Sequence, residues 1–200
     1  YVTAAVLGLV MGSFLNVIIY RVPRNLSVVR PRSFCPKCRT KIPWYENVPV
    51  ASYVALRGRC RRCGARISPR YPIVEAAGAA LAMIAFWGFG PTLNAVFAFA
   101  FLMALMAVTF IDWDFRIIPD GISIPFIAIG LLWSLVNPAL TLAGSAVGAL
   151  AGGGSLYLVG LIYKGVRKTE GMGGGDVKLM AMIGAFLGIK LGVPVILIAS

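Results

Sequence analysis

The feature that most constrains this chain is its succession of apolar runs, each about as long as a bilayer is thick. A helix needs about 20 apolar residues to cross the hydrocarbon core. Because 59% of the 200 residues are hydrophobic and only 13% are charged, one soluble core could not enclose this much apolar surface. The chain is therefore predicted to be all-α, a polytopic membrane helix bundle. Spans are expected at 2–20, 72–90, 92–111, 120–137 and 141–163.

The last part of the chain is apolar from about residue 177 to its end. The stretch Gly188–Gly192 is expected to split it into a short span and the start of another. Because the chain opens and stops inside apolar runs, both ends are expected to be cuts in a longer protein, with closing spans missing. The predicted organisation is a first span (1–20), a cytoplasmic loop domain (21–71) and a multi-span catalytic membrane domain (72–200).

The charges predict the orientation of the spans. The net charge is +12, and 13 of the 19 Lys and Arg lie between Arg21 and Arg70. A basic loop beside a span is typical of the cytoplasmic side, so this concentration indicates topology and lipid headgroup contact rather than nucleic-acid binding. Five successive crossings then place 112–119 and 164–175 on that same side.

Two CxxC pairs mark the basic loop as a metal site. Each pair can offer two thiolates to one ion, and two pairs separated by 21 residues complete a tetrahedral site. Disulfides or free thiols are the alternatives, but a reducing cytoplasm disfavours disulfides. With no His and no fifth Cys in the chain, the ion, zinc or a similar metal, is expected to be structural. The ligands would be Cys35, Cys38, Cys60 and Cys63.

Four of the seven acidic residues lie at predicted span ends. Carboxylates beside hydrocarbon are costly to keep, so a functional role is the default hypothesis. Asp112 closes the third span, and Asp176 opens a later one after three glycines, which permit positive φ and close approach of another chain. Two carboxylates at one membrane depth could share a proton, as in aspartic proteases. From the residues alone, catalysis, ion transport and a structural polar contact all remain open for this pair.

The other two carboxylates have simpler interpretations. Asp120 follows Pro119 and precedes Gly121, the pattern of a helix N-cap, and Asp114 could be an exposed interfacial charge. Asn16 in the first span could be a polar contact between helices.

Seven segments of the chain, in order, resemble the bacterial prepilin peptidases, which are GxGD-type aspartic proteases and in many cases also N-methyltransferases. These segments are GSFLNVIIYRVPR, CPKC, IPWYENVPV, LRGRC, CGARISPRYPIVE, IDWDFRIIPD and EGMGGGDVKL. The resemblance covers Met11 to Gly188. It implies that Asp112 and Asp176 are the catalytic pair, with Gly173, Gly175 and Lys178 as support for the catalytic loop. Gly174 departs from the family, which often has an aromatic residue there.

The resemblance also implies an activity. Such enzymes remove a short basic leader from prepilins and pseudopilins at the cytoplasmic face of the bacterial inner membrane. Many then methylate the new N-terminal amine with S-adenosylmethionine. No glycine-rich fingerprint for this cofactor is visible, so the domain order of the family points to the basic loop, with Gly58 and Glu75, as the methyl-donor region. Glu46 and Glu75 are also candidate contacts for the leader, and Glu75 could instead orient the loop.

Three other functions are compatible with parts of the sequence. A proton- or cation-coupled transporter could use Asp112 and Asp176, but it would favour carboxylates near mid-membrane and internal repeats, and neither pattern is visible. A non-enzymatic assembly factor could dock through the cysteine loop. A protease that cuts within the bilayer would use the two aspartates but would not require four cysteines.

Overall fold

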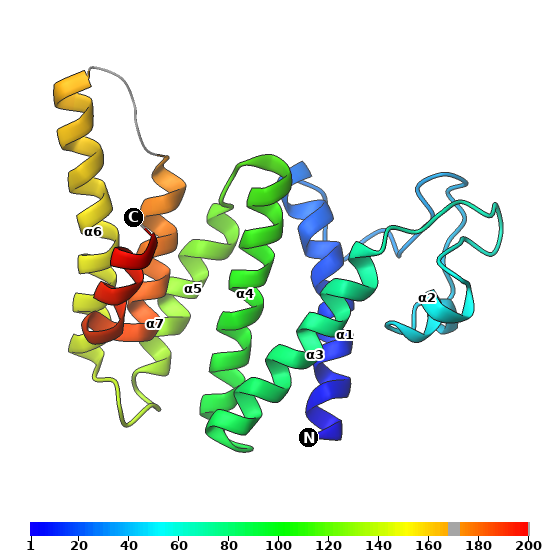
Figure 1. The fold of residues 1–200 in the computed structure, drawn as a ribbon, viewed down its shortest axis with the longest axis horizontal. Helices are drawn as coiled ribbons and strands as arrows, with labels where there is room; N and C mark the ends of the chain where they lie inside the picture. Colours follow the sequence, from blue (N-terminus) through cyan, green and yellow to red (C-terminus); the bar gives the residue numbers. More distant parts are fainter. Residues whose placement is uncertain (168–172, 200) are drawn as a thin grey trace. The chain divides into compact units, whose positions relative to one another are not determined.

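The protein is helical wherever the structure describes regular secondary structure. The computed structural model describes residues 1–167 and 173–199, and for residues 190–199 it describes the backbone alone. Its described helices are α1 (Val2–Arg21), η1 (Val22–Arg24), η2 (Trp44–Glu46), α2 (Ala51–Ala55), α3 (Arg70–Phe89), α4 (Leu93–Phe115), α5 (Asp120–Trp133), α6 (Leu142–Arg167) and α7 (Gly174–Ala199). The chain divides into two compact units, Tyr1–Ala95 and Val96–Ser200 (Figure 1).

Four of the described helices are long and apolar enough to cross a membrane: the segment Val2–Arg24, which contains α1, and the helices α3, α4 and α6. The prediction of a multi-pass helical membrane protein is confirmed. The span predicted at 120–137 is wrong in its length, because α5 stops at Trp133 ahead of Asn137 and Pro138. Its 14 residues rise about 21 Å, less than the roughly 30 Å of a hydrocarbon core.

Unit 1 is built on the crossing of α1 and α3. The two helices run antiparallel and approach so closely that a Cβ on Gly8 or Gly78 would overlap the backbone of the other helix. In lipid the hydrophobic effect does not drive two helices together. Small residues instead let the two backbones pack closely, which stabilises the pair. The Asn16 amide donates a hydrogen bond to the Tyr71 carbonyl across this interface (3.1 Å). The prediction of a helix-to-helix contact at Asn16 is therefore confirmed.

Unit 2 packs α4 to α7 around Phe186. This side chain is 2% exposed, stacks on Phe101 of α4 with ring centroids 4.2 Å apart, and lies 5.4 Å from the Trp133 ring of α5. Helices α6 and α7 run antiparallel, and backbone atoms around Gly184 occupy the space that a Cβ on Gly148 would need. The Ser145 hydroxyl donates to the Ala185 carbonyl at the same interface (2.6 Å).

Helix α7 breaks at Gly188, as the sequence predicted. The backbone there has φ 65° and ψ 180°, which no helix contains and which an L side chain rarely adopts. The break separates a first helical segment, which carries Asp176 and Phe186, from the remainder of α7. Only the first segment contributes side chains to the described core of unit 2.

Candidate functional site

The four cysteines of unit 1 lie in two loops of the same structure. In each loop the first Cys accepts a backbone N–H bond at its carbonyl and donates its own N–H to a carbonyl five residues later, Thr40 or Ala65. Arg39 and Gly64 take positive φ at equivalent positions (55° and 68°). Short β-bridges, Phe34 with Lys41 and Arg59 with Arg66, close the two loops. The repeated geometry makes two matched knuckles that face each other.

The sulfur atoms of Cys35, Cys38, Cys60 and Cys63 lie within 4.8 Å of one another. The Sγ atoms of Cys35 and Cys63 are 3.8 Å apart. A tetrahedral zinc site with Zn–S bonds of about 2.3 Å has S···S edges of about 3.8 Å. The cluster therefore has the spacing of a four-thiolate metal site.

The electrostatics of the cluster differ from one thiol to another. Hydrogen bonds from the side chain and backbone N–H of Thr40 lower the pKa of the Cys38 thiol to about 6. Backbone N–H groups of Cys63 and Arg62 lower the pKa of Cys60. At Cys63 the Ala65 N–H also lowers the pKa, but desolvation and the neighbouring thiols outweigh it and raise the pKa to about 11. Closely spaced thiolates repel one another, and a divalent cation would offset that repulsion.

Two glutamates attach the knuckles to the rest of unit 1. The Glu46 side chain is 10% exposed and pairs with the Arg61 guanidinium at 3.0 Å. Glu75, buried on α3, accepts a hydrogen bond from the backbone N–H of Val50 (2.7 Å). Val50 has φ 58°, so Glu75 stabilises a strained turn ahead of α2. This contact ties the loop to α3, as expected if Glu75 orients the loop, and neither carboxylate is exposed.

A cavity of about 440 Å³ lies within unit 1. Its polar lining includes Glu46, Glu75, Asn16 and three tyrosines, Tyr20, Tyr53 and Tyr71. Its volume lies in the range of small-molecule pockets. Gly58 is not part of the lining. Its φ is +64° and a Cβ there would lie 3.0 Å from the Tyr53 ring, so Gly58 leaves space for a tyrosine that does line the cavity.

Asp112 and Asp176 lie at the same end of unit 2. Asp112 is in the last turn of α4, 11 residues after Phe101, and Asp176 is in the first turn of α7, 10 residues before Phe186. The two rings stack on each other, and α4 and α7 run in opposite directions (Figure 1). At about 1.5 Å per residue, both aspartates lie about 15–16 Å beyond the stacked rings. Both side chains are exposed.

The loop between α4 and α5 packs on the start of α7. A Cβ on Gly175 would lie 2.9 Å from the Ile118 Cβ, so a larger residue would separate the two segments. Gly174 and Gly175 are already helical, and none of the three glycines has positive φ. At Gly175 the close approach is made by Ile118 of this same chain, and the freedom at positive φ is not used. Room for another chain at these glycines stays a prediction. A Cβ on Gly173 would lie 3.4 Å from Asp176 Oδ2.

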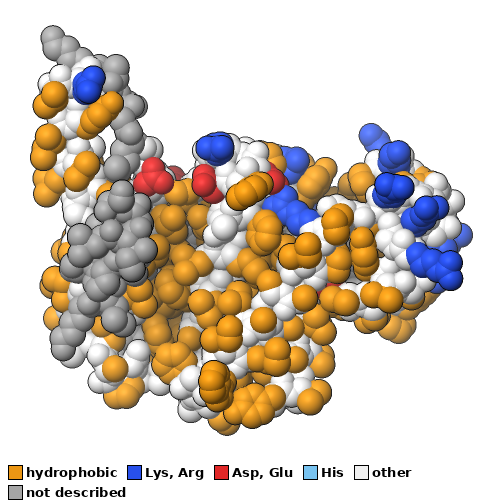
Figure 2. All heavy atoms as spheres, viewed as in Figure 1, with side chains coloured by type: hydrophobic (Ala, Val, Ile, Leu, Met, Phe, Trp, Pro, Cys, Tyr) orange, Lys and Arg blue, Asp and Glu red, His pale blue; other side chains and the backbone are white. Residues whose placement is uncertain are grey.

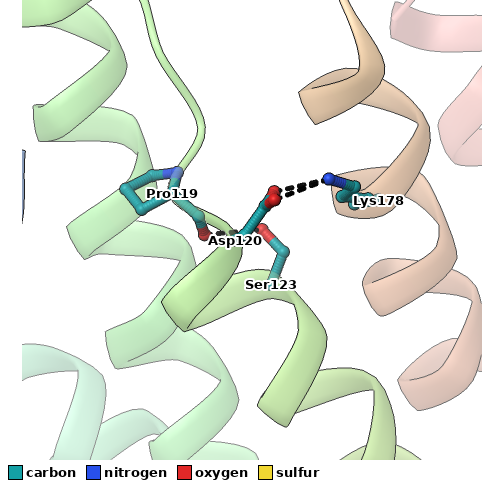
Figure 3. Close-up of polar contacts among 4 residues, drawn as sticks. All are labelled: Pro119, Asp120, Ser123 and Lys178. Atoms are coloured by element: carbon teal, nitrogen blue, oxygen red, sulfur yellow. Dashed lines mark hydrogen bonds and ion pairs between the residues drawn. The ribbon is translucent and has the colours of Figure 1, made fainter.

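Asp120 is not the N-cap that its sequence pattern predicts. It is the first residue of α5, Pro119 occupies the N-cap position, and no side chain caps the helix. The Asp120 carboxylate instead accepts both of its bonds from Lys178 Nζ, each at 2.7 Å (Figure 3). This ion pair joins the first turns of α5 and α7 next to Asp176. Asp114 is exposed in the last turn of α4.

Sequence reasoning missed several residues of these two sites. The partner of Lys178, the three cavity tyrosines and the packing of Ile118 on Gly175 depend on contacts between segments distant in the chain. Of these contacts, only the Asp120–Lys178 ion pair could have been suspected from the sequence, because both residues are ionisable groups at predicted span ends.

Fold and sites together define the class of protein: a multi-pass helical membrane protein with a four-cysteine loop and a group of carboxylates at helix ends. Two family models match the chain, "Bacterial Peptidase A24 N-terminal domain" over residues 6–89 and "Type IV leader peptidase family" over residues 99–200. No solved structure matches.

Curated relatives agree with the family models. The chain is 39% identical to the prepilin leader peptidase/N-methyltransferase of Neisseria gonorrhoeae, over 98% of this chain and 77% of that protein. It is 38% identical to the protein of the same name from Klebsiella pneumoniae, over 96% and 87%. For the relative from Burkholderia pseudomallei strain 1026b the identity is 40%, over 98% and 72%. The chain belongs to the type IV leader peptidase family.

Proposed function

We propose that this protein is a membrane aspartic endopeptidase that removes the basic leader from type IV prepilins or pseudopilins and then methylates the new N-terminus. The observation that carries the proposal is the position of Asp112 and Asp176 at one end of unit 2, at matching distances from the Phe101–Phe186 stack, in a chain of this family. Relatives bear the name of both activities.

In the cleavage reaction, one of the two carboxylates acts as general base on a water molecule. The other donates a hydrogen bond that polarises the scissile carbonyl. Gly173 supports this role because a side chain there would lie against the Asp176 carboxylate. Gly175 and Lys178 support it by holding the start of α7 against Ile118 and Asp120.

The four cysteines would hold one zinc ion in a structural role. Four thiolates fill a tetrahedral coordination shell and leave no open position for a substrate or water. When bound, the ion would neutralise the thiolates and cross-link the two knuckles. Unit 1 would then keep its loop ordered around the cavity without taking part in peptide hydrolysis.

S-adenosylmethionine would bind in the cavity of unit 1. It supplies a methyl group on a sulfonium cation, which aromatic faces stabilise. Three tyrosines line the cavity, together with Glu46 and Glu75, although Glu46 is paired with Arg61 and other basic side chains also line it. Gly58 contributes indirectly by leaving space for Tyr53. The chain's own residues would orient the substrate amine and exclude water around it.

The active face would be the cytoplasmic face of the bacterial inner membrane. The support is the concentration of 13 of the 19 basic residues in 21–70 and the positive-inside rule. Membrane lipids and prepilins or pseudopilins would be its partners. The transporter alternative has no support in unit 2, because the described carboxylates lie at helix ends rather than midway along α4 or α7.

The direct test is incubation of the purified protein with a prepilin, reading cleavage and the mass of the new N-terminus together. The expected product lacks the leader and, with S-adenosylmethionine present, gains one methyl mass. An intact prepilin with a folded, metal-loaded enzyme would refute the peptidase assignment. A cleaved but unmethylated product would refute the second activity alone.

A further inference from the structure

Arg21, at the end of α1, is a buried cation that has no carboxylate partner within unit 1. Its side chain is 7% exposed and donates to two backbone carbonyls, Ser27 at 2.8 Å and Pro31 at 2.6 Å. Unit 1 contains two acidic residues, and both are engaged elsewhere, Glu46 with Arg61 and Glu75 with the Val50 N–H. A buried charge normally has a counter-ion, because removing it from water is costly.

Arg21 lines one end of an open groove of about 420 Å³ in unit 1. One wall is the α1 face that carries Val10, Phe14 and Val17, and the other is the loop segment that includes Trp44 and Arg32. Val10, Phe14 and Trp44 are 52%, 44% and 81% exposed, so this apolar surface has no cover within unit 1.

The groove has the length of one leaflet of a bilayer. Val10 and Arg21 are 11 residues apart on α1, which is about 16 Å of helix, and half of a hydrocarbon core is about 15 Å. With the basic loop at the membrane surface, the apolar wall would lie at acyl-chain depth. Arg21, Arg32 and Trp44 would then lie toward the level at which headgroups and interfacial tryptophans are found. Figure 2 shows Lys and Arg gathered on the loop part of unit 1.

We propose that this groove is a binding site for one anionic phospholipid. The phosphate serves as counter-ion to Arg21, whose guanidinium has donors left after its two carbonyl bonds, and Arg32 adds a second charge at the mouth. One acyl chain lies along Val10, Phe14 and Val17. The site would attach the cysteine loop to the membrane surface. Arg21 and Val17 also line the cavity proposed for S-adenosylmethionine, whereas binding of the lipid itself requires neither the proposed peptidase nor the proposed methyltransferase activity.

Other occupants fit less well. Inorganic phosphate could neutralise Arg21 but would leave the apolar wall uncovered. A substrate with a basic leader would add positive charge beside Arg21 instead of neutralising it. A single acyl chain with a phosphate at one end matches both the charge and the shape.

The test measures lipid binding to the purified full-length protein by native mass spectrometry, with phosphatidylglycerol and phosphatidylcholine of the same acyl chains. The wild type should bind about one phosphatidylglycerol at least about tenfold more tightly than phosphatidylcholine, because the buried cation recognises charge. Arg21→Gln should lose this preference. Arg24→Gln is the matched control, because Arg24 is exposed and stacks on the Tyr20 ring, and it should keep the preference.

A second measurement needs no change at Arg21. In nanodiscs, acyl-brominated phosphatidylglycerol should quench a component of the tryptophan fluorescence that is missing in Trp44→Phe. The proposal would be overturned if the two lipids bound equally, if Arg24→Gln lost the preference as Arg21→Gln does, or if Trp44 were not quenched. Competition by millimolar inorganic phosphate or displacement of the lipid by prepilin would also overturn it.

Discussion

The two units of this protein differ in charge as well as in chemistry. Unit 1 carries 13 basic and 2 acidic residues and all four cysteines, whereas unit 2 carries 6 basic and 5 acidic residues and no cysteine. The possible metal ligands and the cavity are therefore in one unit, and the exposed aspartates are in the other. The proposed metal and methyl-donor sites are thus encoded in a different unit from the proposed catalytic carboxylates. Each proposed activity should then be removable without the other.

The largest effect is expected from neutralising the aspartates of unit 2. Asp112→Asn or Asp176→Asn should lower the cleavage rate by at least about 10²-fold, because each removes an acid–base group while preserving its shape. The double variant should be no worse than either single one, since the pair acts as a unit. Cleavage assays with metal analysis on the same samples check this, and the metal content of unit 1 should not change.

Asp114→Asn is the control for this loss, because Asp114 lies on the same last turn of α4 and should keep measurable cleavage. Methylation of a pre-cleaved pilin should also persist in Asp112→Asn. Retained cleavage in Asp112→Asn, or loss of methylation together with cleavage, would contradict the separation of the two units.

The second effect is the converse change in unit 1. Cys60→Ser removes one of four ligands, so the protein should lose its metal, about one zinc per chain in the wild type, and the loop 30–70 should exchange amide hydrogens faster. The methylation rate should drop because the loop is less ordered. The cleavage rate should drop only to the extent that the loop helps to position the substrate. A reduced, metal-free wild type with an ordered loop would show that the cysteines have another role.

A smaller effect, on stability rather than activity, tests the packing of unit 2. Gly148→Ala should lower the free energy of unfolding by about 1–3 kcal/mol, because its Cβ would overlap the backbone of α7. Gly154→Ala on the same helix is the matched control, since no atom lies within 4 Å of its added Cβ. Thermal unfolding in one detergent compares the two. Equal melting temperatures would mean that α6 and α7 do not pack as described.

The smallest effect is expected for the ion pair beside Asp176. Its members are 38% and 58% exposed, and exposed pairs contribute about 0–1 kcal/mol. Asp120→Asn and Lys178→Met should therefore reduce the cleavage rate by no more than about fivefold, a loss that corresponds to about 1 kcal/mol. The swap Asp120→Lys with Lys178→Asp should restore part of the loss. If the swap is worse than both single variants, the pair does not hold α7 by charge alone.

The sequence by itself determined the elements and the kinds of chemistry. Apolar runs of span length predicted α1, α3, α4 and α6 because hydrocarbon accepts only backbone that satisfies its own hydrogen bonds. The break at Gly188 and the four-cysteine cluster were also predictable, since each depends on a local pattern of residue types. The sequence equally identified Asp112 and Asp176 as unusual, because carboxylates beside apolar runs are rare.

The tertiary structure alone decided how these residues are used. In the structure Asp120 pairs with Lys178 and does not cap a helix. Glu75 accepts a hydrogen bond from the Val50 backbone, and Gly175 packs closely against Ile118. The tertiary structure also left Arg21 buried without a carboxylate partner within unit 1. The physical reason is that these assignments depend on contacts between helices, and the spacing of residues along one helix predicts only which of them share a face.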